Sequence, residues 1–324
     1  MTALTPGISV VVPAYNSEST LPLLFSRLRA VLPKVARDYE VIVVNDGSRD
    51  GTWPVLEQEA RTDTSIQPIN LMRNYGQHNA LLCGIRAARY DTCVTIDDDL
   101  QHPPEEIGRL LGELSKGFDV VYGTPQAEQH GLWRNLASRV TKLALQSAMG
   151  ADVARKVSAF RAFRTEVRDA FAGFQGAFLS VDVLLTWGTT RFGAIPVQHD
   201  ARTIGKSNYT FRKLLVHALN MVTGFSTVPL QIASLLGFAF TLLGLLLFIY
   251  VLVVYVVQGR SVPGFPFLAS VITIFSGAQL FALGIIGEYL ARIHARTMEK
   301  PPYAVRHSST SAEPFVQRVS GLDR

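Results

Sequence analysis

Two long apolar runs in the C-terminal third of the chain most constrain its fold. Residues 228–257 and 261–287 contain no Asp, Glu, Lys or Arg. Each run is longer than the roughly 20 residues that cross a bilayer core as a helix. A buried helix of a soluble protein rarely extends so far without a polar face. The sequence therefore predicts two transmembrane helices joined by a short loop.

The charges beside these runs predict their orientation. The link between them, residues 258–266, has one cation, Arg260. Cations precede the first run at Arg202, Lys206, Arg212 and Lys213, and they follow the second at Arg292, Arg296 and Lys300. The positive-inside rule then puts both termini in the cytoplasm. The N-terminal apolar run, ISVVVPAY, lacks the basic start and cleavage site of a secretion signal. We expect a multi-pass protein of the cytoplasmic (inner) membrane with a cytoplasmic N-terminal domain.

Residues 208–225 have apolar side chains at helical spacing, with Arg212 and Lys213 on other faces. In a soluble protein this pattern is typical of a surface helix, but directly before a membrane span it favours an interfacial helix. We therefore expect four parts: a cytoplasmic domain over 1–207, an interfacial amphipathic helix over 208–227, a two-helix transmembrane hairpin over 228–290 and a cytoplasmic tail over 291–324. After Lys300 the tail is rich in Pro, Ser and Thr, and we expect it to be poorly ordered.

The residues before about 200 alternate between strand-like and helix-like segments. Strands are predicted over 8–13, 40–45, 66–71, 93–96 and 118–123, and helices over 19–32, 52–61, 77–89 and 103–115. This alternation predicts a mostly parallel sheet with helices on both faces. Three of the strands end in polar loops, PAYNSE, NDGSRDGT and DDDLQ. Because ligands bind at the carboxyl ends of such strands, these loops should meet along one edge.

The segment TIDDDLQHPPEE places three acids directly after a strand. Carboxylates that repel one another are stabilised by a divalent cation. Asp and Gln oxygens suit Mg²⁺ or Mn²⁺, and Mg²⁺ typically takes one or two carboxylates together with substrate phosphates. The segment therefore predicts a metal that carries a diphosphate. For an isolated DxD pattern, a solvated acidic turn before a helix is the commoner explanation.

The acids are not isolated. PAYNSE, VNDGSRDGT, RNYGQHNA, DDDLQHPPEE and GKSNYTFRKL occur in this order before the two predicted spans. Over roughly residues 8–300 this set resembles the GT-A glycosyltransferases of family 2. It is most similar to the polyprenyl-phosphate (dolichyl-phosphate mannosyltransferase-like) enzymes, in the branch of the undecaprenyl-phosphate 4-deoxy-4-formamido-L-arabinose transferases and bacteriophage-type glucosyl carriers. The resemblance implies an α/β fold with a GT-A-type sheet, followed by the interfacial helix and two transmembrane helices.

The resemblance also implies a nucleotide-sugar donor, with a UDP-sugar expected, and Mg²⁺ or Mn²⁺ as cofactor. The residues that match the metal site are Asp97, Asp99 and Gln101. The residues that match the nucleotide-sugar site are Pro13, Tyr15, Glu18, Asp46, Ser48, Arg73, Asp97 and Asp98. From local sequence alone, Asp46 and Ser48 are as typical of a plain turn. We expect Asp98 to matter least of the acids, because its side chain faces away from its neighbours in an extended segment.

The acceptor that the resemblance implies is a polyprenyl phosphate, with undecaprenyl phosphate expected. Its phosphate is largely ionised at neutral pH and needs little help from a general base. It would attack the anomeric carbon with inversion, with Asp99 and Arg202 as the catalytic residues. The residues assigned to the lipid phosphate or diphosphate are Arg161, Arg202, Lys206, Ser207 and Arg212. Attraction to the membrane surface is an alternative role for these cations.

The chain departs from the usual family pattern at several positions. Relatives usually have Glu where this chain has Ser17, and often have Ala where it has Asp98 and Gly where it has Ala159. His78 and His102 have no partner at metal-ligand spacing, so we interpret His78 as structural and His102 as a capping or turn residue.

The product expected is a lipid-linked sugar for cell-envelope glycan or lipid A modification. The alternatives are a processive polysaccharide synthase, a non-catalytic partner in sugar-lipid translocation, and a degenerate transferase without turnover. The first would normally have more spans and a QxxRW motif. The second leaves DDDLQ unexplained. The bilayer is a partner, no nucleic acid is expected, and a homo-oligomer is left open.

Overall fold

One sheet runs through the N-terminal domain. The computed structural model describes residues 4–125, 156–176, 179–200, 228–258, 264–298 and 300–308, and these contain eight strands in the order β7-β5-β6-β4-β1-β2-β3-β8. Their bounds are β1 Thr5–Ala14, β2 Tyr39–Asn45, β3 Ile66–Leu71, β4 Tyr90–Thr95, β5 Val120–Pro125, β6 Arg161–Arg164, β7 Phe192–Val197 and β8 Val305–Ser308. Strands β6 and β8 pair antiparallel with their neighbours, and the other pairs are parallel.

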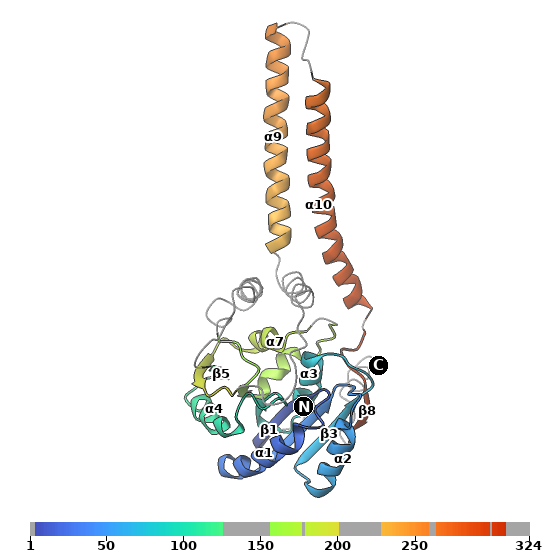
Figure 1. The fold of residues 1–324 in the computed structure, drawn as a ribbon. Coiled ribbons are helices and arrows are strands. Elements are labelled where there is room, and N and C mark those ends of the chain that lie inside the picture. Colours follow the sequence, from blue (N-terminus) through green and yellow to red (C-terminus); the bar gives the residue numbers. More distant parts are fainter. Residues whose placement is uncertain are drawn as a thin grey trace, which may run out of the picture.

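Helices cover both faces of this sheet (Figure 1). They are α1 Leu21–Val35, α2 Thr52–Thr62, α3 Gln77–Ala87, η1 Pro104–Glu106, α4 Ile107–Leu114, η2 Thr165–Phe171 and α7 Val181–Gly188. Side chains alternate along β1, so Val10 and Val12 join α1, α2 and α4 in one apolar core, and Val11 joins α3 and α7 in the other. The predicted three-layer α/β architecture is confirmed.

Helix α1 shows how the sequence sets these elements. Pro22 lies in its first turn, where a missing N–H costs little. Its apolar side chains recur at helical spacing and are buried: Leu21, Leu24, Phe25, Leu28, Val31 and Leu32. The helix therefore packs along one stripe against the sheet, as its periodicity predicts.

The order of the strands shows at which edge of the sheet a ligand crevice is expected. From β1 the chain runs outward through β2 and β3, and then returns to β4 on the other side of β1. Strands β1 and β4 are parallel neighbours, with Val11 opposite Thr95. This is a topological switch point, at which α/β sheets open a crevice beyond the carboxyl ends of the strands.

Three strands were not predicted, and one of them, β7, pairs parallel with β5 at one edge of the sheet. Strand β6 inserts antiparallel between β4 and β5, and β8 pairs antiparallel with β3 at the sheet edge. The expectation of a poorly ordered tail after Lys300 is therefore wrong for residues 300–308. Tyr303 is buried against α3, where Arg86 lies over its ring at 5.8 Å. The segment is ordered because it completes a sheet edge and buries an aromatic ring.

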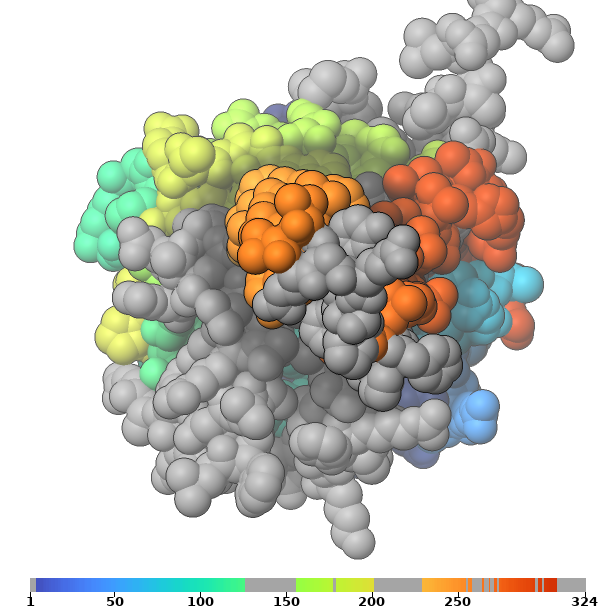
Figure 2. Space-filling model, turned by 90° about the horizontal axis from the view of Figure 1, so that it is seen from above, coloured from blue at the N-terminus to red at the C-terminus, as the bar shows by residue number. Residues whose placement is uncertain are grey.

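Two long helices follow the domain, α9 Val228–Gln258 and α10 Phe265–Thr297. They project side by side from it (Figure 1), and seen from above they overlie the domain (Figure 2). Each contains a stretch long and apolar enough to cross a membrane, Pro229–Val254 and Ile274–His294, and neither stretch is buried within the protein. The rings of Phe240 and Phe275 meet edge to face at 5.7 Å between them. The chain is therefore a membrane protein.

The second helix extends further than its charge-free run. It continues past Gly287 to Thr297, and Glu288 pairs with Arg292 one turn later at 2.8 Å. The predicted interfacial helix at 208–227 lies outside the described residues, as do most of the loop between the spans and the tail after Ser308.

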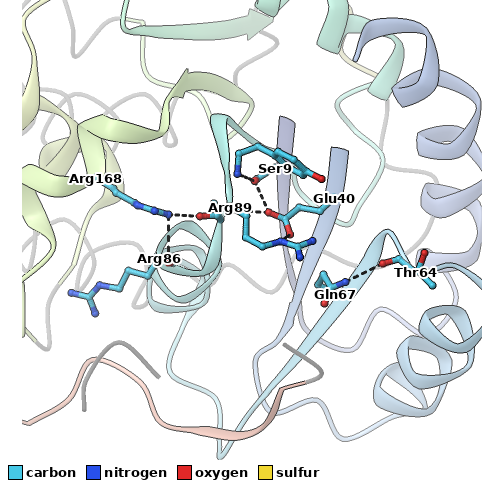
Figure 3. A network of polar contacts seen from close by, with 9 residues as sticks. Ser9, Glu40, Thr64, Gln67, Arg86, Arg89 and Arg168 are labelled. Carbon is cyan, nitrogen blue, oxygen red and sulfur yellow. Dashed lines mark hydrogen bonds and ion pairs between the residues drawn. The ribbon is translucent and has the colours of Figure 1, made fainter. Parts of the chain in front are cut away.

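The end of the sheet opposite the switch point is closed by a polar network (Figure 3). Glu40 is 1% exposed, and its carboxylate accepts hydrogen bonds from Ser9 Oγ at 2.7 Å and from Arg89 N and Nε at 2.8 Å each. Arg168 donates to the carbonyls of Ile85 and Ala88 at the end of α3, at 2.9 and 2.6 Å. These contacts satisfy buried polar groups within the fold itself.

Candidate active site

Four loops meet at the switch point, as predicted for the loops after β1, β2 and β4. The first loop is residues 15–20 after β1, the second is 46–51 after β2, the third is 72–76 after β3, and the acid turn is 97–101 after β4. Each is held to at least one of the others by hydrogen bonds between side chain and backbone.

The first and second loops are joined along their length. Asn16 adopts a left-handed conformation, with φ 56°, and its Oδ1 accepts from Arg49 N at 2.9 Å. Its own N–H donates to Ser48 Oγ at 2.9 Å, and Glu18 Oε2 accepts from Gly51 N at 2.9 Å. Asn is among the few residues that adopt this φ at low cost. Tyr15, the other nucleotide candidate here, is 42% exposed and open to a ligand.

Asp46 holds the third loop. Its carboxylate accepts from Tyr75 N at 2.7 Å and from Gly76 N at 2.8 Å, and it is 3% exposed. Burial raises the pKa of Asp46 against the opposing effect of these two hydrogen bonds. At Gly47, φ is +66°, and a Cβ would lie 2.5 Å from the backbone of Arg73 and Asn74. The structure thus places Asp46 behind the site, where it orients the loop that carries Arg73.

Pro13 is buried in the sheet, whereas Arg73 is exposed on a loop. Pro13 lies within buried strand β1 beside Val44 of β2. Arg73 is exposed on the third loop, its guanidinium 4.2 Å from the centroid of the Tyr75 ring. An exposed guanidinium on a loop beside the acid turn has the chemistry to pair with an anionic ligand.

The acid turn differs in conformation from the extended segment we expected. Strand β4 ends at Thr95, Asp98 and Asp99 lie in a turn, and Leu100 has φ 60°. Asp97 Oδ1 accepts from Gln77 Nε2 at 2.7 Å, and Asp99 Oδ1 accepts from Gln101 N at 3.1 Å. Because the backbone turns here, the alternation of side chains that applies to strands no longer applies.

The environment of Asp97 favours a bound cation. Burial, followed by the charges of Asp99 and Asp98, raises the pKa of Asp97 to about 7, against the opposing charge of Arg161. A carboxyl with a pKa raised by burial and by like charges gains most from a positive ion placed beside it. The charges of Asp99 and Asp98 thus act on Asp97 in the same direction as its burial.

The side chain of Asp98 faces the first loop. Its Oδ2 accepts from Tyr15 N at 3.3 Å and from Ser17 Oγ. Both donors belong to the first loop. Burial, the largest effect, raises the pKa of Asp98 in spite of these hydrogen bonds.

Arg161 is also placed differently from the prediction. It is 1% exposed, its Nε donates to Thr95 Oγ1 at 2.9 Å, and its Nη1 pairs with Asp182. Tyr122 completes the network by donating from its hydroxyl to Asp182 at 3.2 Å. A guanidinium committed to these partners is not open to a lipid phosphate. It instead supplies a fixed positive charge behind Asp97.

His102 packs in the core and does not cap the following helix. It is 8% exposed, it stacks on Phe160 at 5.4 Å and meets His199 edge-on at 5.0 Å. Burial, and then the charge of His199, lowers the pKa of His102 to about 4, so it is neutral at physiological pH. His78 accepts from Val181 N at 3.4 Å, which is a structural role, as interpreted.

The chain that leads toward the basic loop is tied to the acid turn. Asp200 N donates to Gln101 O at 2.8 Å, beside the edge-on pair of His102 and His199. The sequence-predicted acceptor residues follow directly in the chain but lie outside the described residues: Arg202, Lys206, Ser207 and Arg212.

The donor set of the acid turn fits a divalent cation. Among the described residues, no three His, Cys, Asp or Glu side chains are grouped to enclose a metal. Two carboxylates with a neighbouring amide instead match Mg²⁺ or Mn²⁺ whose remaining positions are filled by phosphates and water. This chemistry agrees with a site that binds its metal together with a diphosphate.

Comparisons with known proteins find relatives of this chain. The pattern described as "Glycosyl transferase family 2" matches residues 9–171. Undecaprenyl-phosphate 4-deoxy-4-formamido-L-arabinose transferase of Pseudomonas aeruginosa (strain UCBPP-PA14) is 34% identical over 319 residues, 96% of this chain and 94% of the relative. The protein of the same name from Pectobacterium atrosepticum is 35% identical over 313 residues, 95% of each chain.

Among solved structures, glucosyl-3-phosphoglycerate synthase from Mycobacterium tuberculosis in complex with Mn²⁺ and UDP-glucose is 21% identical, with a TM-score of 0.48 over 67% of this chain and 77% of that one. The match to the family pattern over half of the chain and the similarity to relatives over nearly its full length lead to one assignment. The chain belongs to glycosyl transferase family 2 and is a glycosyltransferase.

Proposed function

We propose that this glycosyltransferase moves a sugar from a nucleotide-sugar, a UDP-sugar in the first instance, to undecaprenyl phosphate with inversion at the anomeric carbon. The observation that carries the proposal is the meeting of the acid turn with the first loop and with Gln77 at the start of α3, beside the β1/β4 switch point, in a chain with two candidate spans. The names of the relatives supply the acceptor.

In this proposal Asp97 and Asp99, with Gln101, would hold Mg²⁺ or Mn²⁺. When bound, the metal neutralises the charge that develops on the leaving diphosphate. Tyr15, Glu18 and Ser48 border the place for the nucleoside, on the two loops that their hydrogen bonds join. Asp46 acts through the third loop, which it orients toward the same place with Arg73.

The acceptor side rests on the basic residues after Asp200. The acceptor phosphate is itself the nucleophile, so the protein's task is to hold two anions in line. Arg202, Lys206, Ser207 and Arg212 would neutralise the acceptor phosphate. The contact between Asp200 and Gln101 supports this placement, because it brings the start of the basic loop to the metal-binding turn.

The placement of both ends of the hairpin on one side of the membrane has a structural argument, whereas the charges alone assign that side to the cytoplasm. Strand β8 follows α10 and pairs with β3 of the domain, so the chain returns to the side from which it left. Both ends of the helical hairpin therefore lie on one side of the membrane. We expect a cysteine at Ser261 to be labelled by an impermeant reagent from outside cells, and a cysteine at Ser311 to be protected. Labelling with the reverse pattern would contradict the orientation.

The function is tested with purified full-length protein, a panel of UDP- and GDP-sugars, and undecaprenyl phosphate, with the lipid product identified by mass. We expect one UDP-sugar to give a lipid-linked monosaccharide in Mg²⁺ or Mn²⁺ and none in EDTA. A polymeric product would indicate a processive synthase. Donor hydrolysis without a lipid product would reject the acceptor, and an absence of any turnover would indicate a degenerate transferase. Light scattering of the same sample measures whether it is a homo-oligomer.

A further inference from the structure

Two residues at which this chain departs from the usual family pattern touch each other. Ser17 lies on the first loop and Asp98 in the acid turn, 81 positions apart, and the serine hydroxyl donates to the aspartate carboxylate. The same Oδ2 of Asp98 accepts from Tyr15 N at 3.3 Å, and Ser17 Oγ in turn accepts from Tyr15 N at 3.0 Å. The three groups form a closed set of contacts between the two loops.

Ser17 is a rigid anchor for this contact. It is 4% exposed, and its N–H donates to Thr52 Oγ1 at 2.8 Å. Its carbonyl accepts from the N–H groups of Thr20 and Leu21 at 3.1 Å each, at the start of α1. Because its backbone is held from both sides, the hydroxyl has little freedom to follow a moving partner.

Asp98 lies between the two carboxylates assigned to the metal. In a turn, neighbouring side chains move together with the backbone that carries them. Asp97 contacts Gln77 of α3, and Asp99 contacts the backbone of Gln101. The contact of Asp98 with the first loop is therefore a third attachment, on the side of the turn where Tyr15 is exposed.

We propose that Asp98 and Ser17 form a latch that positions the metal-binding carboxylates against the nucleoside loop. Asp98 is then a positioning residue and acts through Asp97, Asp99 and the Tyr15 backbone. With the latch closed, the place for the nucleoside and the place for the metal keep one spacing, which a single nucleoside diphosphate must bridge. The inference rests on the proposed function and deepens it.

The latch predicts a pattern among variants that other roles would not produce. Asp98→Ala and Ser17→Ala each open it, and each should lower kcat/KM for the donor by about tenfold to a hundredfold, the loss typical of a misplacement near 1 Å. The double variant should be no worse than Asp98→Ala, because residues in one contact are not additive. Asp98→Asn keeps an acceptor oxygen and should stay within about threefold of the parent.

An exchange of the two side chains gives a sharper test. Ser17→Asp alone places a second carboxylate against that of Asp98. Its kcat/KM for the donor should therefore be lower than that of Ser17→Ala. Ser17→Asp combined with Asp98→Ser rebuilds a hydroxyl–carboxylate pair of the same combined length. We expect this combination to recover at least tenfold over Ser17→Asp, because like charges at close range disfavour each other. Ser115→Ala and Asp169→Ala, both at exposed positions, are the matched controls.

The same proteins are titrated with Mn²⁺ in the presence of UDP, followed by electron paramagnetic resonance. This measurement does not depend on turnover or on the acceptor. We expect Asp98→Ala and Ser17→Ala to weaken Mn²⁺ binding about tenfold and Asp98→Asn to leave it nearly unchanged. If wild type binds Mn²⁺ with UDP in this pattern but makes no lipid-linked sugar, the latch stands and the proposed function fails.

Three outcomes would overturn the latch. If Asp98→Asn lowers kcat/KM as much as Asp98→Ala does, while Ser17→Ala behaves like the parent, then Asp98 is a ligand of the metal or of the donor. Additive effects of the two alanine variants would show that the residues act separately. Lower melting temperatures for both alanine variants, with unchanged kcat/KM and Mn²⁺ affinity, would give the contact a role in stability alone.

Discussion

The two ends of the sheet bury carboxylates in opposite ways. At the end away from the switch point, Glu40 is bonded to Arg89 and Ser9, and Asp119 is bonded to Arg191 at 2.7 and 2.9 Å. At the site end, the side chain of Asp97 accepts from the amide of Gln77, and that of Asp98 accepts from a hydroxyl and a backbone N–H. Glu40 and Asp119 each have a guanidinium among their partners, whereas the hydrogen-bond donors to Asp97 and Asp98 named here are neutral.

The pKa values follow this difference. Burial raises the pKa of Asp119, but the hydrogen bonds from Arg191 and Thr189 and the charge of Arg191 outweigh it, so the net pKa is lowered. The pKa values of Asp97 and Asp98 are raised by burial. A carboxylate paired within the fold contributes to stability. A carboxylate whose charge the fold does not fully compensate is suited to bind a cation that arrives with the substrate.

The largest effect is expected at Asp99. In the proposed function, Asp99→Ala removes one of the two carboxylates that would hold the metal, and the unneutralised diphosphate is then a poor leaving group. Turnover at saturating Mn²⁺ should fall by about a thousandfold or more, with little change in melting temperature. Asp97→Ala should be nearly as severe, with donor affinity most affected. The measurement is lipid-product formation beside thermal unfolding.

Asp169→Ala, at an exposed position far from the acid turn in sequence, serves as the control and should behave as the parent. If Asp99→Ala turns over normally while Asp98→Ala is inactive, the assignment of the acid turn to a metal is wrong.

The second prediction concerns Arg202, a cation that the proposed function places beside the acid turn. Arg202 follows Asp200 closely in the chain, and Asp200 is bonded to the acid turn. Arg202→Ala should reduce transfer by about tenfold to a thousandfold, as when one stabilising charged donor is lost from a transition state. The assay is run in detergent. A normal rate there would assign Arg202 to attraction by the membrane surface.

The third prediction moves to the opposite end. Glu40→Gln places an amide N–H against the Arg89 donors and should cost about 2 kcal/mol of unfolding free energy, or roughly 4–8 °C in melting temperature. The kcat of the folded protein should stay near that of the parent. The exposed Glu57→Gln is the matched control. A large loss of turnover without a loss of stability would contradict the assignment of the Glu40 end of the sheet to stability and of the other end to function.

The smallest effect is a pH dependence at Asp119. Its folded pKa is lowered, so the ionised pair adds stability above the unfolded pKa of about 3.9 and loses it as pH falls through the folded value. The melting temperature of the parent should exceed that of Asp119→Asn at pH 7, and this gap should shrink below about pH 4. Asp38→Asn, at an exposed position, is the control. A gap that stays constant to pH 3 would contradict the role of the charge.

The sequence by itself was sufficient for the order of strands and helices through β5, the two long apolar helices, and the loops that line the site edge. These features are local: periodicity, turn residues and length decide them, and a short window contains all of the information. The acids of the acid turn were identified from the ordered set of motifs around them, because the acids alone are more typical of a solvated turn.

Only the tertiary structure decided which side chains face each other. Strand β8 pairs with β3 across more than two hundred residues, and Arg161 is neutralised by Asp182 of α7, a partner that no spacing in the sequence reveals. Ser17 and Asp98 were each noted as departures, but their contact depends on β1 and β4 lying side by side. A local pattern sets the period of an element, whereas its neighbours are set by how the whole chain buries its apolar faces.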